Sequence, residues 1–267
     1  GAVNALRAAI VRGARHVYAG GTIARGARPG DGYVFDRLRG YEEGDDPRRI
    51  DWSASARIGA LQTRVYLEET VLVLGALVDE SRSMRVGRKR PLSAAADEAL
   101  RAWFGAAETT DRAGRIVDER LVGDRRATVD VRAAGPFDLR RSLELAVRAL
   151  PQGSSFLLIT DGLDVASGDA FADVLLRIGR RFDATVLLAR DPWIDGLPLR
   201  GFVRLRDAES GRTRRVFIGP RARERYRRAS AERDAAIRDA FERARWRIGT
   251  LDESDGAASL ERAFGLR

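Results

Sequence analysis

The 267-residue sequence contains no cysteine, one histidine and one methionine. Without cysteine, the chain can form no disulfide bond, thiolate nucleophile or cysteine-based zinc site. No apolar stretch approaches the roughly 20 residues that a membrane-spanning helix needs. Lys89 is the only lysine among 48 cationic residues, and this extreme use of arginine is more typical of a GC-rich genome than of one particular partner. The redox compartment stays open, and the cytoplasm is the default expectation.

The inventory of catalytic residues is equally thin. His16 lies in a predicted N-terminal helix, far in sequence from every polar loop that could complete a Ser-His-Asp triad with it. The chain carries no G-x-S-x-G elbow, no S-x-x-K motif and no phosphate-binding P-loop. Asp161 and Asp164 could pair, but no neighbouring residue in the sequence is suited to tune one of them as an acid. We therefore expect a protein that is not an enzyme.

The net charge of +9 favours anionic partners in general. The arginines, however, are spread along the chain and interleaved with acidic residues. We find no alternation of aromatic and basic residues of the kind that single-strand binders use. Nucleic acid is therefore not the expected partner, and a basic nucleic-acid or membrane-surface binder is kept as an alternative.

The chain divides into an N-terminal part, residues 1–66, and a larger part, residues 67–267. Residues 1–15 read as a helix followed by a Gly-rich connector, and residues 31–66 are dense in charge and turn formers. The larger part alternates strand and helix patterns, which predicts an α/β fold, a mostly parallel sheet with helices on both faces. We expect strands at 71–78, 113–117, 127–132, 155–160, 184–189 and 246–251, helices at 92–104, 138–150, 170–181, 221–245 and 256–264, and a β-hairpin from 202–206 and 214–218.

One strand pattern ends in polar residues. Eight apolar residues from Val71 to Val78 predict a central strand buried on both faces, and Asp79, Ser81 and Ser83 follow. Open α/β sheets bind ligands at the carboxyl ends of their strands. One carboxylate and two hydroxyls in a tight turn suit a hard cation such as Mg²⁺, Mn²⁺ or Ca²⁺. The alternative is a structural turn, in which Asp79 caps and the serines satisfy loop amides.

A second motif is much longer. Residues 38–57 read LRGYEEGDDPRRIDWSASAR, and this segment resembles the signature of the bacterial domain-of-unknown-function 58 family nearly throughout. Residues 65–69 and the D-x-S-x-S motif follow in the order and spacing of that family. Residues 207–211 and 224–226 are similar to its later hairpin turn and long helix. The resemblance extends from about Arg28 to the C-terminus.

The resemblance implies a Rossmann-like von Willebrand factor A-type domain with a metal-ion-dependent adhesion site. Asp79, Ser81 and Ser83 match the first element of that site, and Asp161 matches the last. The family's threonine is expected where Phe137 stands. Loss of that hydroxyl predicts a degenerate site that binds Mg²⁺ or Mn²⁺ weakly, or no metal.

The signature alternates acidic and basic residues around two aromatic rings. Such interleaving suits Arg–carboxylate pairs that hold together a segment without its own core. We expect this segment to dock on the larger domain through Tyr41, Ile50 and Trp52, and we predict that Trp52→Ala destabilises the protein if docking buries the ring. The alternative is a surface that receives a side chain of a partner. The signature residues that carry these expectations are Arg39, Tyr41, Gly44, Asp45, Asp46, Arg49, Asp51, Trp52 and Arg57.

These observations together predict a protein-interaction module. Members of the family resemble partners of MoxR-type AAA+ ATPases, so the resemblance implies such an ATPase as partner and chaperone-like or assembly work as the role. Arg82 and Arg85 beside the metal turn could receive a carboxylate of the partner. A metal-dependent hydrolase that uses Asp79 and Asp161 is a further alternative, although no general base is evident.

Overall fold

The computed structural model forms two compact units. The sheet unit consists of residues 1–20 and 72–267, and the signature unit consists of residues 21–71. The described residues are 2–20, 34–67, 73–107, 112–117, 120–122, 137–167, 171–189, 193, 200–206 and 211–266.

The sheet unit is built on a six-stranded sheet in the order β10-β7-β6-β3-β4-β5. Neighbouring strands from β10 to β4 are parallel, and β5 adds an antiparallel edge. The predicted central strand is confirmed, since β3 lies between β6 and β4. The strand predicted at 127–132 falls outside the described residues. The strands are β3 (Val73–Val78), β4 (Arg112–Val117), β5 (Arg120–Val122), β6 (Ser155–Thr160), β7 (Asp183–Ala189) and β10 (Arg247–Leu251).

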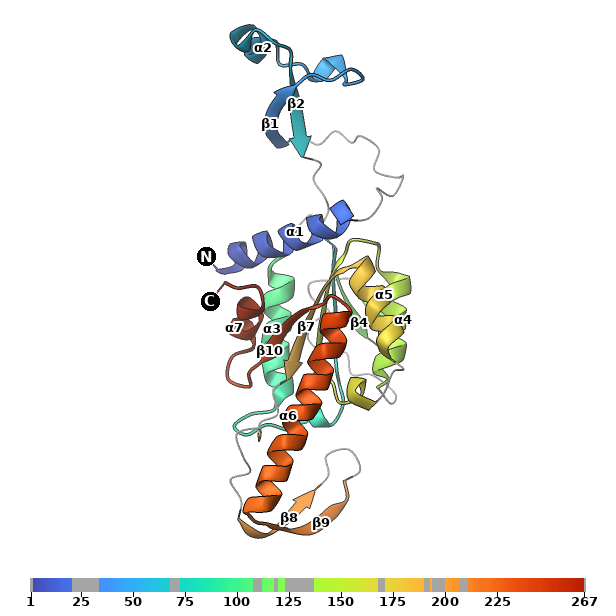
Figure 1. Ribbon diagram of the computed structural model, residues 1–267, viewed down its shortest axis with the longest axis vertical. Helices are drawn as coiled ribbons and strands as arrows, with labels where there is room; N and C mark the ends of the chain where they lie inside the picture. The colour runs from blue at the N-terminus through green and yellow to red at the C-terminus, as the bar shows by residue number, and fades with distance from the viewer. Residues whose placement is uncertain are drawn as a thin grey trace. The chain divides into compact units, whose positions relative to one another are not determined.

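Helices cover both faces of this sheet, as the alternating pattern predicted (Figure 1). One face packs against α1 (Ala2–Gly20), α3 (Leu92–Gly105) and α7 (Gly256–Ala263). The opposite face packs against α4 (Leu139–Ala149), α5 (Ala172–Arg181) and α6 (Pro220–Arg243). The architecture is therefore a mixed α/β fold with helical layers on either side of a mostly parallel sheet.

Helix α1 belongs to the sheet unit, which differs from the predicted boundary at residue 66. Leu6 and Ile10 of α1 are buried in the core beside β3 and β6 residues. Their four-residue spacing places both side chains on one helix face, so burial of this stripe explains why the helix joins the sheet rather than the signature segment.

A β-hairpin precedes the long arginine-rich helix. Strands β8 (Gly201–Arg206) and β9 (Thr213–Ile218) pair antiparallel, as predicted, and the turn at 207–210 lies outside the described residues. The C-terminal half of α6 buries Ile237 and Phe241 in the core on the sheet face that α4 and α5 also cover. The N-terminal end of α6 lies beside the hairpin, at the lower end of the sheet unit in Figure 1.

The signature unit is a small hairpin with a short helix. Strands β1 (Val34–Gly40) and β2 (Gln62–Leu67) pair antiparallel, and α2 (Trp52–Ile58) lies between them in sequence. The signature unit itself leaves Trp52 68% exposed. Trp52 opens α2, and its neighbours one turn later are Ser55 and Ala56, which offer no large apolar surface. Burial of this ring therefore depends on docking of the segment on the larger domain, which stays a prediction together with the stability loss on Trp52→Ala.

No helix in the described part of the chain is both long enough and apolar enough to cross a membrane.

Candidate functional site

The candidate site begins at the carboxyl end of β3, where Asp79 follows the buried strand. The Asp79 backbone N–H donates to the Ile159 carbonyl of β6 at 2.8 Å, which extends the sheet by one residue. The side chain is only 3% exposed. Its Oδ1 accepts a hydrogen bond from the Ser81 N–H at 2.8 Å, so the carboxylate also closes the turn.

Sequence reasoning missed the second partner of this carboxylate. The Thr160 hydroxyl, at the end of β6, donates to Asp79 Oδ2 at 2.6 Å, and Thr160 is fully buried. Thr160 Oγ1 also accepts the Gly162 N–H at 3.0 Å. The signal was available, because Thr160 ends an apolar run next to Asp161 just as Val78 ends one next to Asp79. Thr160 therefore ties the polar ends of β3 and β6 together.

The two serines lie together, as the D-x-S-x-S spacing predicted. The Ser81 and Ser83 hydroxyl oxygens are 2.8 Å apart and share a hydrogen bond. A short 3-10 helix, η2 (Ser83–Arg85), follows and buries Met84 in the core. Arg82 and Arg85 are exposed on either side of Met84. The turn thus presents hydroxyl oxygens with two exposed arginines in the same loop.

Asp161 occupies the equivalent position after β6. Its Oδ1 accepts the Leu163 N–H at 3.0 Å in a tight turn, and the side chain is half-buried. Because β6 is the direct neighbour of β3, Asp161 and Asp79 stand at the same sheet edge. The structure therefore brings two carboxylates and two serine hydroxyls to adjacent strand ends.

Burial raises the pKa of Asp79 above its ordinary value of 3.8. The hydrogen bonds from Thr160 and Ser81 act in the opposite direction, and the nearby Asp164 carboxylate adds to the increase. A desolvated carboxylate of this kind gains from a cation that compensates its charge.

These side chains fit a hard cation, though incompletely. Asp79, Asp161 and the two serine hydroxyls offer oxygen ligands, which Mg²⁺ and Mn²⁺ prefer. The described residues contain no group of three or more His, Cys, Asp or Glu side chains arranged for a metal. Phe137 packs its half-buried ring against the core below α4, so it offers no ligand where the resemblance implies a threonine. An ion here would depend on hydroxyls, water and a ligand from outside.

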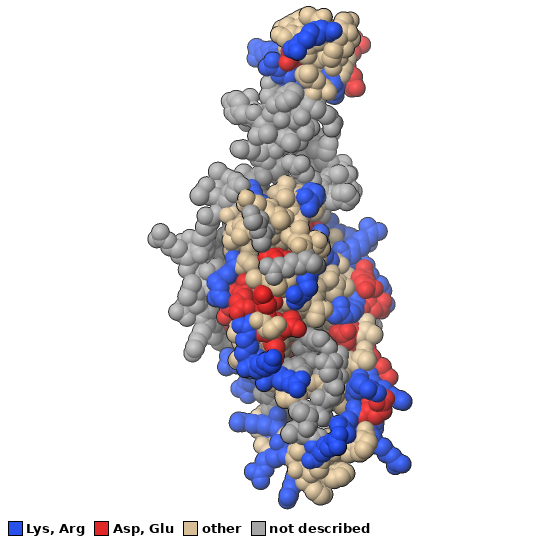
Figure 2. Space-filling view, turned by 90° about the vertical axis from the view of Figure 1, so that its left-hand side faces the viewer, with Lys and Arg blue, Asp and Glu red and all other residues tan. Residues whose placement is uncertain are grey.

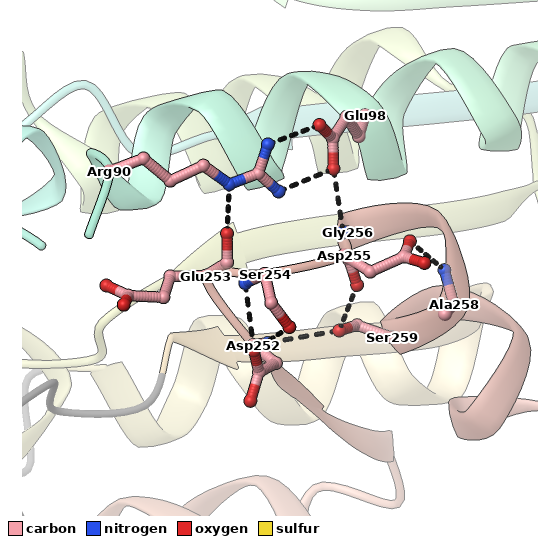
Figure 3. A network of polar contacts seen from close by, with 9 residues as sticks. All are labelled: Arg90, Glu98, Asp252, Glu253, Ser254, Asp255, Gly256, Ala258 and Ser259. Atoms are coloured by element: carbon pink, nitrogen blue, oxygen red, sulfur yellow. Dashed lines mark hydrogen bonds and ion pairs between the residues drawn. The ribbon is translucent and has the colours of Figure 1, made fainter. Parts of the chain in front are cut away.

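The loop after the serines is held from the far end of the chain (Figure 3). The Glu253 carboxylate accepts the backbone N–H groups of Arg88 and Lys89 at 2.7 and 3.1 Å. Arg90 donates to the Glu253 carbonyl and binds the Glu98 carboxylate of α3 through both terminal nitrogens, with Nη2–Oε2 at 2.7 Å. These contacts fix residues 83–90 against α3 and the loop that joins β10 to α7.

In the signature unit the predicted ion pairs organise the segment itself. Arg39 Nη2 lies 2.6 Å from Asp45 Oδ1, and the other oxygen of Asp45 accepts the Glu42 N–H at 3.0 Å. The bond from the Glu42 N–H and that from Arg39 lower the pKa of Asp45. Gly44 adopts φ 105°, a left-handed conformation that favours glycine and sharpens this turn.

Two further aspartates of the signature, Asp46 and Asp51, cap its helices. The Asp51 carboxylate accepts the Ala54 N–H at the start of α2 and pairs with Arg64 Nε at 3.0 Å. Asp46 accepts the Arg48 N–H at the start of a 3-10 helix, η1 (Pro47–Arg49). The prediction did not name Arg64 as a partner, and Arg57 donates to the Ser53 carbonyl at 3.3 Å rather than to a carboxylate. The charges thus stabilise the fold of the segment, while Trp52 stays exposed.

We expect Asp79→Asn to stabilise the metal-free protein at neutral pH. Because the folded-state pKa is raised, Asp79 favours folding most below pH 3.8, and this contribution is lost as pH rises through the raised pKa. At neutral pH the wild type must keep a charged carboxylate buried, which costs free energy, whereas the amide is uncharged. The free energy of unfolding of the variant should therefore be higher by on the order of 1 kcal/mol at neutral pH. Urea unfolding at neutral and acidic pH measures the difference. Asp173→Asn, on exposed α5 surface, is the control, and a less stable Asp79→Asn variant at neutral pH would contradict the expectation.

Comparison with known proteins identifies the family of this chain. A family sequence profile described as "Protein of unknown function DUF58" matches residues 37–236. Uncharacterized proteins of Mycobacterium bovis and of two Mycobacterium tuberculosis strains are each 29% identical over 236 residues, covering 79% of this chain and 72% of the relative. The crystal structure of the conserved hypothetical protein BatB from Bacteroides thetaiotaomicron aligns with a TM-score of 0.48 and 13% identity, covering 73% of this chain and 96% of that one. On the profile match, this chain belongs to the DUF58 family.

Proposed function

We propose that the protein is a non-enzymatic interaction module that receives a carboxylate of a protein partner at the end of β3. The observation that carries this proposal is the buried Asp79 carboxylate, held by Thr160 and Ser81 beside the paired serine hydroxyls. In this proposal the sheet unit is a von Willebrand factor A-like domain with a degenerate metal-ion-dependent adhesion site. The partner is a MoxR-type AAA+ ATPase in the cytoplasm, and the work is chaperone-like or concerned with assembly.

The charge pattern around the turn supports a carboxylate as the incoming group. Mg²⁺ or Mn²⁺ held by Asp79, Asp161 and the serine hydroxyls would keep coordination positions for water or a partner's Asp or Glu. Without metal, Arg82 and Arg85 can form charge-assisted hydrogen bonds to the same carboxylate. The partner's carboxylate would bind to the same surface through the metal ion or through the arginines. The surface can therefore bind the partner even if its affinity for metal is weak.

Metal titration tests the first route. In calorimetry with Mg²⁺ and Mn²⁺, we expect weak binding by the wild type, tighter binding by Phe137→Thr and none by Asp79→Ala, because the threonine restores a hydroxyl ligand and the alanine removes a carboxylate. Absence of heat for both wild type and Phe137→Thr would make the turn purely structural.

A pull-down from the native host tests the partner. The wild type should recover an AAA+ ATPase, and the Asp79→Ala, Arg82→Ala variant should lose it. The control variant Asp173→Ala, Arg148→Ala removes one acid and one arginine from exposed helix surface and should bind as the wild type does. Equal recovery by both double variants would show that this surface does not carry the contact, and recovery of no ATPase would refute the partner.

A further inference from the structure

The net positive charge of the chain is concentrated in one segment. Residues 200–228 contain eleven arginines and three acidic residues, a net charge of 11 − 3 = +8 out of the total of +9. The rest of the chain, with 37 cationic and 36 acidic residues, is close to neutral. The arginines are spread along the whole chain, but the excess of arginine over acidic residues lies in this segment. This segment forms the hairpin β8–β9 and the first two turns of α6.

The hairpin has two unlike faces, because strand side chains alternate between them. On one face Ile218 is buried and Val203 and Val216 are half-buried. The opposite face carries only exposed side chains: Phe202, Arg204, Arg206, Thr213, Arg215 and Phe217. Lys and Arg side chains gather at the lower end of the sheet unit in Figure 2.

Two large aromatic rings lie on this exposed face. Phe202 and Phe217 are directly opposite each other in the strand register, 73% and 59% exposed. Their ring centroids are 5.1 Å apart in an edge-to-face arrangement. The Arg215 guanidinium carbon lies 5.8 Å from the centroid of the Phe202 ring. Contact of apolar rings with water is unfavourable in free energy. The exposure of two neighbouring rings therefore indicates a surface that is covered when the protein binds a partner or a membrane.

We propose that this hairpin face binds an anionic lipid bilayer, with Phe202 and Phe217 entering the interface and the arginines at the level of the phosphates. Aromatic and apolar side chains ringed by arginine are what peripheral membrane anchors present. Among the described residues of 200–228, Glu224 is the only acid, so few carboxylates oppose an anionic surface. The two rings pack on each other as one wedge, whereas nucleic-acid bases need separate open ring faces on which to stack.

Sedimentation of the full chain with vesicles tests this. We expect binding to phosphatidylcholine vesicles that contain phosphatidylglycerol, little binding to phosphatidylcholine alone, and release at high salt because exposed charges are screened. Arg204→Gln with Arg215→Gln should weaken binding about 25-fold, at about one fivefold step per arginine. Arg148→Gln with Arg180→Gln removes two exposed arginines on α4 and α5 and is the matched control.

The rings are tested without a change of charge. Phe202→Ala with Phe217→Ala should weaken vesicle binding by about tenfold or more, since two apolar side chains no longer leave water. In Phe202→Trp, the added tryptophan should be quenched by brominated lipid. Unchanged binding of the double alanine variant, absence of quenching, equal binding to neutral vesicles, or tighter binding to a DNA duplex than to anionic vesicles would each overturn the proposal.

Discussion

Replacing Gly256 by alanine is expected to destabilise the protein by about 3 kcal/mol, near the upper end for overpacked cores. Gly256 is the first residue of α7 and packs directly on the backbone of α3. A Cβ there would lie 1.8 Å from the Ala95 carbonyl oxygen and 3.0 Å from the Ala99 nitrogen. Both neighbours are helix backbone, so relief requires α7 to move away from the core that contains Leu260. Thermal unfolding should show a melting temperature lower by about 6–12 °C.

Gly105→Ala is the matched control for this substitution. Gly105 ends α3, is exposed, and has no atom within 4 Å of the position of an added Cβ. Alanine favours helix over glycine by up to about 1 kcal/mol, so this variant should be neutral or slightly stabilised. Equal melting temperatures for the Gly256→Ala and Gly105→Ala variants would contradict the close packing of α7 on α3.

Glu98→Gln is expected to cost about 2 kcal/mol at neutral pH. The Glu98 carboxylate binds Arg90 with both oxygens and accepts the Gly256 N–H at 3.0 Å. The pair is about 30% exposed, so solvent screening keeps the loss below that of a fully buried ion pair. The bond to Arg90 is the main reason that the pKa of Glu98 falls from 4.5 to about 2.

The pH dependence of this loss identifies the carboxylate as its source. A lowered folded-state pKa gives stability that is fully present above pH 4.5 and disappears as pH falls toward about 2. The difference in free energy of unfolding between wild type and Glu98→Gln should therefore shrink across that interval in urea titrations. Glu144→Gln, which breaks a surface pair with Arg140 on α4, should change stability by less than about 0.5 kcal/mol at any pH. A constant difference for Glu98→Gln would contradict the assignment.

The sheet unit was predictable because its strands and helices are long and strongly patterned. Runs such as Phe156–Ile159 are apolar throughout, and a strand buried on both faces between helices has few alternatives. The helix predicted at 138–150 starts at Asp138, whose carboxylate caps α4 by accepting the Arg141 N–H at 2.9 Å. A helix cap depends only on residues that are close in sequence, so it can be predicted without the tertiary fold.

The errors arose where distant residues decide the outcome. Local sequence does not specify what covers Trp52, because the short α2 provides no apolar neighbour for its ring within the signature unit. The pairing of Asp51 with Arg64 spans thirteen residues across the hairpin, and local spacing does not specify it. The role of Thr160 depends on strand order, since only the adjacency of β6 and β3 brings its hydroxyl to Asp79. Charge segregation was missed because composition averages over the whole chain.

The contact of Glu253 with the Arg88 and Lys89 amides sets an order of assembly during synthesis. The two amides are separated from that carboxylate by 165 and 164 residues of sequence. A ribosome adds about 5–20 residues each second, so β3 and the Asp79 turn emerge several seconds before the residue that clamps the following loop. A nascent chain that extends past residue 161 but has not reached residue 253 therefore contains the hydroxyls and carboxylates of the site but lacks the clamp on the loop beside them. On the proposed function, a partner that requires the fixed loop would distinguish finished molecules from unfinished ones.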